Sequence, residues 1–81
     1  MEHYFCIRFY GSLEQVLGKE KCIKLEECSK IGMVLQQMLS EKRVPLGLDD
    51  LLVVSNGRNV GFDESTCNTS RIEVYRLMQG G

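Results

Sequence analysis

Several residue types that build catalytic and metal sites are almost absent from this chain of 81 residues. It has one histidine, His3, one proline and no tryptophan. A zinc site or a Cys/His catalytic pair needs histidines or closely spaced cysteines, so the sequence offers almost no material for either. Glycine-rich phosphate loops, paired catalytic carboxylates and the common hydrolase motifs are also missing. The composition therefore indicates a protein without catalytic residues of its own.

Charge of one sign is lacking too, because 10 basic and 11 acidic residues give a formal net charge of −1. The charges are spread along the chain, so neither nucleic acid nor an anionic membrane is a predicted partner. No apolar run reaches the length of about 18 residues that a transmembrane helix needs. Residues 1–4 lack the basic and apolar regions of a secretory signal. We expect a cytosolic protein.

The cysteines are Cys6, Cys22, Cys28 and Cys67. They could pair in several ways, but without an export signal the prediction is reduced thiols. The closest two, Cys22 and Cys28, have five residues between them, which matches neither a zinc-finger spacing nor a redox C-x-x-C. We therefore expect structural or incidental thiols, and no role is predicted for Cys67.

The chain is long enough for one small domain over residues 1–81, with a flexible tail at 79–81. Alternation of apolar and polar residues predicts strands over 4–10, 20–26 and 71–78, and an apolar run predicts another over 51–55. The pair Asn56-Gly57 predicts a type I′ hairpin into a short strand at 58–60. Residues 13–18 form a turn or short helical piece, and residues 61–70 a polar loop with at most one helical turn.

One main helix is predicted between the second and third strands. Ser29 is the expected N-cap, and apolar residues at three- and four-residue steps run from Ile31 to Leu39. Pro45 and Gly47 stop the helix. A right-handed crossover through this helix would place the first and last strands side by side and parallel. The predicted fold class is therefore α+β, a β-grasp with a mixed sheet of roughly four to five strands curled around one main helix.

The sequence ends on Gln79-Gly80-Gly81, directly after the last predicted strand. Two terminal glycines arise by chance in about 0.5% of chains at average glycine usage. Glycine lacks a Cβ, so such a tail can thread a channel too narrow for side chains. Three extended residues reach about 10 Å. The tail can therefore deliver a carboxylate into the active site of another enzyme.

The element order, FCIRFYG at 5–11, VVSNGRNV at 53–60 and LMQGG at 77–81 resemble the sulfur carriers MoaD and ThiS and, more distantly, ubiquitin and its related modifiers. The resemblance implies a ubiquitin-like β-grasp that binds no cofactor itself. It implies a partner adenylating enzyme of the MoeB/ThiF type, related to ubiquitin-activating enzymes, that uses ATP to join Gly81 to AMP. Sulfur then converts the activated end to a thiocarboxylate, which a sulfur-acceptor synthase subunit consumes. Molybdopterin biosynthesis is the first expectation, with thiamine or tRNA thiolation as other possibilities.

By the same resemblance, Gly81 is the site of covalent attachment and Gly80 supplies the clearance beside it. Tyr75, Leu77 and Met78 are the candidate docking residues for the partner enzyme. Many MoaD sequences carry a proline pair before the glycines, whereas this chain has Tyr-Arg-Leu-Met at 75–78, closer to the arginine and leucine of a ubiquitin tail. Two alternatives therefore stay open: a protein modifier joined through Gly81 to lysines of target proteins, and a plain interaction domain with an idle tail.

Overall fold

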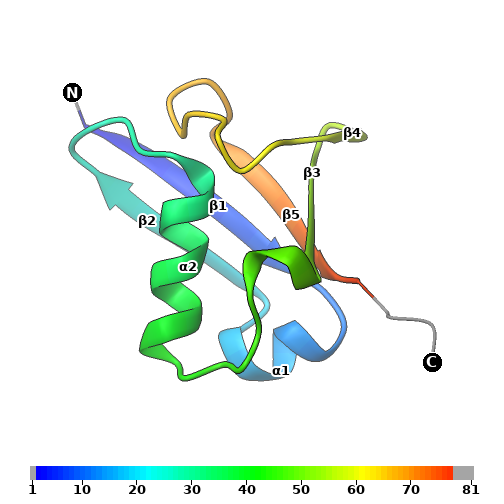
Figure 1. Cartoon of the computed structure of the whole chain (residues 1–81). Helices are drawn as coiled ribbons and strands as arrows, with labels where there is room; N and C mark the ends of the chain where they lie inside the picture. The colour runs from blue at the N-terminus through cyan, green and yellow to red at the C-terminus, as the bar shows by residue number, and fades with distance from the viewer. Residues whose placement is uncertain (1, 78–81) are drawn as a thin grey trace.

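The computed structural model describes residues 2–77 of the chain. Its elements follow one another as β1 (His3–Phe9), α1 (Ser12–Leu17), β2 (Glu20–Leu25), α2 (Ile31–Glu41), a short 3₁₀ turn η1 (Leu48–Asp50), β3 (Leu51–Ser55), β4 (Arg58–Asn59) and β5 (Arg71–Arg76). The five strands form one sheet in the order β2-β1-β5-β3-β4. The helix α2 lies across one face of the sheet (Figure 1).

The pairing of β1 with β5 defines the centre of the sheet. These two strands run parallel with Ile7 opposite Ile72, while β1–β2, β3–β5 and β3–β4 are antiparallel. The first and last strands are joined through α2, as the crossover rule predicts. The predicted β-grasp, with a mixed sheet curled around one main helix, is confirmed.

The core lies between α2 and the inner face of the sheet. Side chains alternate between the two faces of a strand, so every second residue of β1 and β5 points inward. Phe5, Ile7, Ile72 and Val74 are completely buried. On α2 the buried residues recur at helical spacing, and the complete set of buried core residues is Phe5, Ile7, Phe9, Leu13, Leu17, Ile31, Val34, Leu35, Leu39, Leu51, Val53, Ile72 and Val74.

The hairpin between β3 and β4 has the predicted turn. Asn56 has φ 53° and Gly57 has φ 79°, which are the two positive values that a type I′ turn requires. In β2, whose alternation is too loose to predict its facing, Ile23 and Leu25 pack against the core while Cys22 is exposed. The helix α1 occupies most of the stretch 13–18, where the sequence predicts a turn or a short helical piece.

Three element ends differ from the prediction. The N-cap of α2 is Lys30 rather than Ser29, because the backbone of Ser29 is bonded to Thr66 through both its N–H and its carbonyl. The strand β5 ends at Arg76 instead of residue 78, since the N–H of Leu77 donates to the Asp50 carbonyl beyond the sheet register. Residues 61–70 contain turns but no helix.

The prediction of reduced, unpaired thiols is wrong. Cys6 is bonded to Cys22, and Cys28 is bonded to Cys67. The first bond follows from strand register, because Cys6 and Cys22 are directly opposed on β1 and β2 with Cα atoms 4.0 Å apart. The second joins the residues before α2 to the loop between β4 and β5, with Cα atoms 5.4 Å apart. Neither proximity is visible in the spacing of the cysteines along the chain.

Gly32 allows α2 to lie close to the loop after β4. A Cβ at this position would be 2.8 Å from the Cβ of Phe62, and the N–H of Gly32 donates to the Phe62 carbonyl. Glycine to alanine in a helix ordinarily stabilises by about 1 kcal/mol. Here we expect the overpacking to dominate, so that Gly32→Ala lowers the free energy of unfolding by about 1–3 kcal/mol.

Urea denaturation followed by far-UV circular dichroism measures this effect. The matched control is Ser40→Ala on an exposed position of the same helix, which we expect to be neutral or to stabilise by a few tenths of a kcal/mol, on the order of the propensity difference. A Gly32→Ala variant more stable than the original chain would contradict the close approach.

Candidate functional site

The end of β5 is where the chain leaves the sheet toward the predicted site. Arg76 is paired with Leu51 of β3, and the next residue, Leu77, donates its N–H to the Asp50 carbonyl at 2.8 Å. The side chain of Leu77 is 43% exposed. Met78, Gly80 and Gly81 lie outside the described residues. The structure thus fixes the base of the tail down to Leu77.

A pair of stacked tyrosines lies on the outer face of the sheet beside this base. The rings of Tyr10 and Tyr75 are parallel within 9°, with centroids 4.6 Å apart. The Tyr10 hydroxyl donates to Glu73 Oε2 at 3.1 Å, and the guanidinium carbon of Arg8 lies 5.1 Å from the centre of the Tyr10 ring. Partial burial, followed by the hydrogen bond and the charge of Glu73, raises the pKa of Tyr10. The hydroxyl therefore stays a donor at neutral pH, and this fixes the pair.

The predicted docking residues are placed differently from one another. Tyr75 is half-buried because it stacks on Tyr10, whereas Leu77 is exposed beyond the strand end. Sequence reasoning missed Tyr10 as a member of this surface. The signal was available in the predicted parallel pairing, because the register that sets Phe9 opposite Val74 also brings Tyr10 level with Tyr75.

A shallow polar concavity of about 760 Å³ adjoins the tyrosine pair on the outer face of the sheet. Charges of both signs line it, and Arg71 is bonded to Glu20 through two N–H groups at 3.0 and 2.8 Å. The Nε of Arg8 is buried and has no hydrogen-bond partner among the described residues. Paired charges of this kind indicate a hydrated recognition surface with mixed charge.

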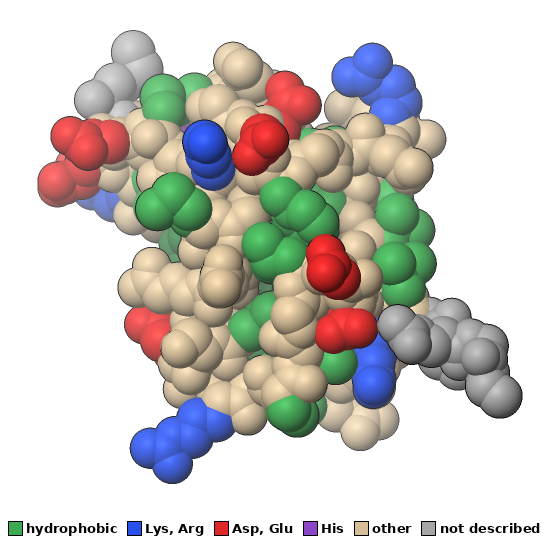
Figure 2. Space-filling view, viewed as in Figure 1, with side chains coloured by type: hydrophobic (Ala, Val, Ile, Leu, Met, Phe, Trp, Pro, Cys, Tyr) green, Lys and Arg blue, Asp and Glu red, His purple; other side chains and the backbone are tan. Residues whose placement is uncertain are grey.

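The opposite face of the molecule, which carries α2, mixes residue types. In Figure 2, hydrophobic side chains are interspersed with polar and backbone atoms, and acidic and basic side chains lie near the point where the chain passes out of the described region. The large hydrophobic side chains that are exposed are scattered, namely Tyr4, Val16, Met33 and Leu77. Single exposed apolar residues are ordinary on a protein surface and do not mark a site by themselves.

Within residues 2–77, no group of three or more His, Cys, Asp or Glu side chains is arranged to hold a metal ion. The helices of this described part are too short and too polar to cross a membrane. The neighbouring acids Asp49 and Asp50 do not form a catalytic pair, since the Asp50 carboxylate accepts the N–H of Gly47 at 2.9 Å while Asp49 is exposed.

The sequence matches no family model and no curated protein. Among solved structures, the chain is similar to SAMP1 from Haloferax volcanii, with a TM-score of 0.72 and 18% sequence identity. The match covers 98% of this chain and 100% of SAMP1. At this identity the likeness establishes the fold, which is that of a ubiquitin-like β-grasp protein.

Proposed function

We propose that this chain is a sulfur carrier whose Gly81 carboxylate is adenylated by a partner enzyme and converted to a thiocarboxylate. The observation that carries the proposal is the junction of fold and tail. The central strand β5 of a ubiquitin-like sheet ends at Arg76, and the sequence then runs through Leu77 and Met78 to two glycines. The proposal requires that Gly81 bears a free carboxylate in the working protein.

The chemistry explains why a partner must act. A carboxylate is a poor electrophile, so one oxygen of Gly81 first attacks the α-phosphorus of ATP, and pyrophosphate leaves. The terminal sulfur of a persulfide then attacks the acyl carbon, and AMP leaves with the electron pair of the broken C–O bond. A second thiol cleaves the resulting acyl disulfide and releases the thiocarboxylate. The acceptor is a synthase subunit of cofactor biosynthesis, with molybdopterin first and thiamine or tRNA thiolation next.

The surface around the tail base supports docking of the adenylating enzyme. Tyr75 is held in a fixed orientation by its stack on Tyr10, so little side-chain entropy is lost when a partner covers it. Leu77 presents apolar surface directly beside the tail. Met78 is assigned to the same docking surface, Gly80 to the clearance of the tail in the partner's channel, and Gly81 to the covalent bond. These assignments are part of the proposal.

The second candidate function is that of a protein modifier, and the likeness to SAMP1, a ubiquitin-like small archaeal modifier, favours it. In this case a lysine amine of a target protein attacks the activated acyl carbon of Gly81, and an isopeptide bond forms. The Arg76-Leu77 pair before the tail fits this alternative as well, since it resembles the tail of ubiquitin. The adenylation step is common to both functions.

Mass spectrometry of the chain and of its conjugates from native cells separates the two functions. Arg76 is the last basic residue, so trypsin releases residues 77–81 as one peptide that contains Gly81 and no cysteine. A sulfur carrier gives this peptide with one oxygen replaced by sulfur. The mass gain is close to that of methionine sulfoxide at Met78, so the decisive signature is alkylation of the terminal sulfur, with a Met78→Leu variant as the control.

A modifier instead leaves residues 77–81 attached to lysines of other proteins after digestion. Recovery of the thiocarboxylate supports the first function, and recovery of the branched peptides supports the second. An unmodified 77–81 peptide, both in cells and after incubation with ATP and an adenylating enzyme, contradicts both and leaves the chain as an interaction domain.

A further inference from the structure

The disulfide between Cys28 and Cys67 lies far from the tail and has a histidine beside it. Cys28 precedes α2, Cys67 belongs to the loop between β4 and β5, and His3 is the first residue of β1. Because β1 and β5 are parallel, the start of β1 and the end of β5 are at opposite ends of the sheet (Figure 1). The disulfide therefore belongs to a different part of the surface from the base of the tail.

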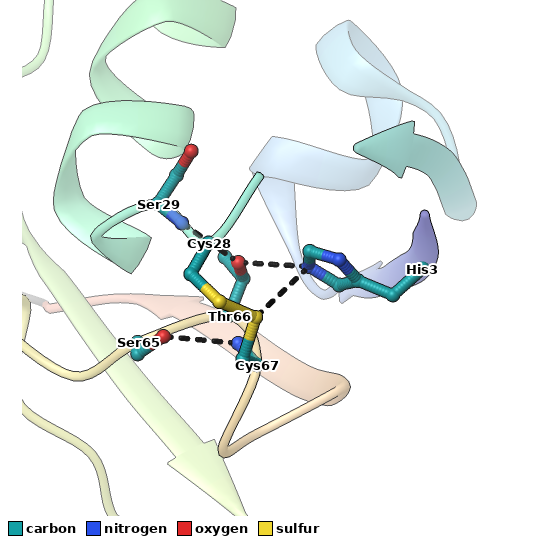
Figure 3. The surroundings of a disulfide bond; sticks show 6 residues. All are labelled: His3, Cys28, Ser29, Ser65, Thr66 and Cys67. Atoms are coloured by element: carbon teal, nitrogen blue, oxygen red, sulfur yellow. Dashed lines mark hydrogen bonds between the residues drawn. A yellow bond between two sulfur atoms is a disulfide. The ribbon is translucent and has the colours of Figure 1, made fainter. Parts of the chain in front are cut away.

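The ring of His3 is held against one sulfur of this bond. Its Nε2 lies 3.0 Å from Thr66 Oγ1 and 3.9 Å from Cys67 Sγ (Figure 3). Thr66 is completely buried, and its Oγ1 also accepts the N–H of Ser29 at 3.1 Å. The other ring nitrogen, Nδ1, is buried and has no partner among the described residues. The polar contacts of the ring are thus concentrated on Nε2.

The two sulfurs are consequently not equivalent. Both cysteines are exposed, so a thiol from solution can approach the bond. When a disulfide is attacked, the sulfur that better carries negative charge is the better leaving group. An N–H donor beside a sulfur stabilises its thiolate. His3 supplies such a donor to Cys67, and no hydrogen bond to the sulfur of Cys28 is present within residues 2–77.

The first disulfide, Cys6–Cys22, provides a comparison within the same molecule. Cys6 and His3 are on opposite faces of β1, since side chains alternate along a strand. His3 is the one histidine in the chain and faces the other bond. Cys22 is exposed, so this disulfide is also open to thiols but without a ring nitrogen beside a sulfur.

We propose that Cys28–Cys67 is a thiol-exchange site that takes up a low-molecular-weight monothiol as a mixed disulfide on Cys28. The thiolate of the monothiol attacks Cys28 Sγ, a new S–S bond forms, and the bond to Cys67 breaks. Cys67 leaves with the electron pair, accepts the hydrogen bond of His3 Nε2 and takes a proton from solvent, which balances the proton lost by the monothiol. A second monothiol can then release Cys28 and leave as the oxidised dimer.

The backbone around the site holds its shape without the disulfide. The N–H groups of Ile31 and Gly32 donate to the carbonyls of Glu64 and Phe62, and the N–H of Thr66 donates to the Ser29 carbonyl at 2.8 Å. Exchange therefore modifies a folded protein, and the mixed disulfide is a surface modification that adds the group carried by the monothiol next to the start of α2.

The test is the position of the adduct after the oxidised full chain is incubated with glutathione. Remaining thiols are trapped with N-ethylmaleimide, and trypsin then separates the cysteines onto residues 1–8, 22–24, 25–30 and 59–71. We expect glutathione on 25–30 and maleimide on 59–71, in about tenfold excess over the reverse pattern and about tenfold faster than any adduct on Cys6 or Cys22. Equal adducts on Cys28 and Cys67, an excess on Cys67, or four free thiols in the air-oxidised chain would overturn the proposal.

Substitution of His3 tests the cause of the selectivity. His3→Phe keeps a ring of similar shape without the N–H, and we expect the ratio of Cys28 to Cys67 adducts to fall toward one. His3→Gln restores a side-chain N–H and should recover most of the selectivity. Tyr4→Phe, at an exposed neighbour, is the matched control and should not change the ratio. An unchanged ratio in a folded His3→Phe variant would contradict the role of the ring, and the adduct pattern of the original chain tests the site without any variant.

Discussion

Replacing both Cys28 and Cys67 with serine is expected to lower the free energy of unfolding by about 4 kcal/mol. The disulfide closes a loop with a sequence separation of 39, and loop-closure entropy in the unfolded chain gives a value near 4 kcal/mol for a loop of that size. The matched variant, Cys6→Ser with Cys22→Ser, opens a loop with a separation of 16 and should lose about 3 kcal/mol. The two loops do not overlap along the chain, so their effects should add.

Urea denaturation gives both the stability and the m-value of each variant. The unfolded state without the long cross-link exposes more surface, so the m-value should rise when Cys28 and Cys67 are replaced, and rise less for the shorter loop. A small domain often retains only a few kcal/mol of stability, so the double variant is compared in the presence of an osmolyte that favours the folded state. A loss below about 1 kcal/mol for the longer loop would show that the bond adds little to folding.

The sheet could be predicted because its information is local. The inward residues of β1 and β5 alternate strictly, and Asn56-Gly57 specifies a turn whose two positive φ values few other residue pairs accept. With one helix and no repeat, the crossover rule then leaves the parallel pairing of β1 and β5 as the simplest topology.

The errors arise where contacts distant in sequence decide the local structure. Ser29 has the right chemistry for an N-cap, but its backbone is bonded to Thr66, which is 37 residues away. The prediction of free thiols rests on a targeting signal and on spacing, whereas the register of β1 and β2 and the approach of the 61–70 loop to α2 bring the cysteines together. The cytosolic location rests on the same reasoning and stays a prediction, since disulfides persist in oxidising compartments and in the cytosol of some thermophiles.

The candidate site is predictable in part. The tail Gln79-Gly80-Gly81 is visible in the sequence alone, and its chemistry follows from glycine and a carboxylate. The sequence identifies Tyr75 but not its partner Tyr10, because their stack depends on the register of two strands that are separated by most of the chain. Such a contact needs a structure or a fully specified sheet.

The largest functional effect is expected from Gly80→Val. Residues 2–77 are unchanged in this variant, so the folded domain and the docking residues Tyr75 and Leu77 stay as they are. A β-branched side chain restricts φ and adds bulk next to the reacting carboxylate. Misplacing a reacting group by about 1 Å can lower a rate roughly hundredfold, and we expect a loss of this order in the adenylation of Gly81.

Pyrophosphate exchange by an adenylating enzyme of the MoeB/ThiF type measures the reaction. Because docking is separate from threading of the tail, Gly80→Val should lower kcat and leave KM nearly unchanged, while Tyr75→Ala should raise KM and largely preserve kcat. Gln79→Ala is the matched control one residue earlier and should react like the original chain. Equal rates for Gly80→Val and the original chain would mean that the tail does not enter a narrow channel, and the role assigned to Gly80 would then be wrong even if Gly81 is activated.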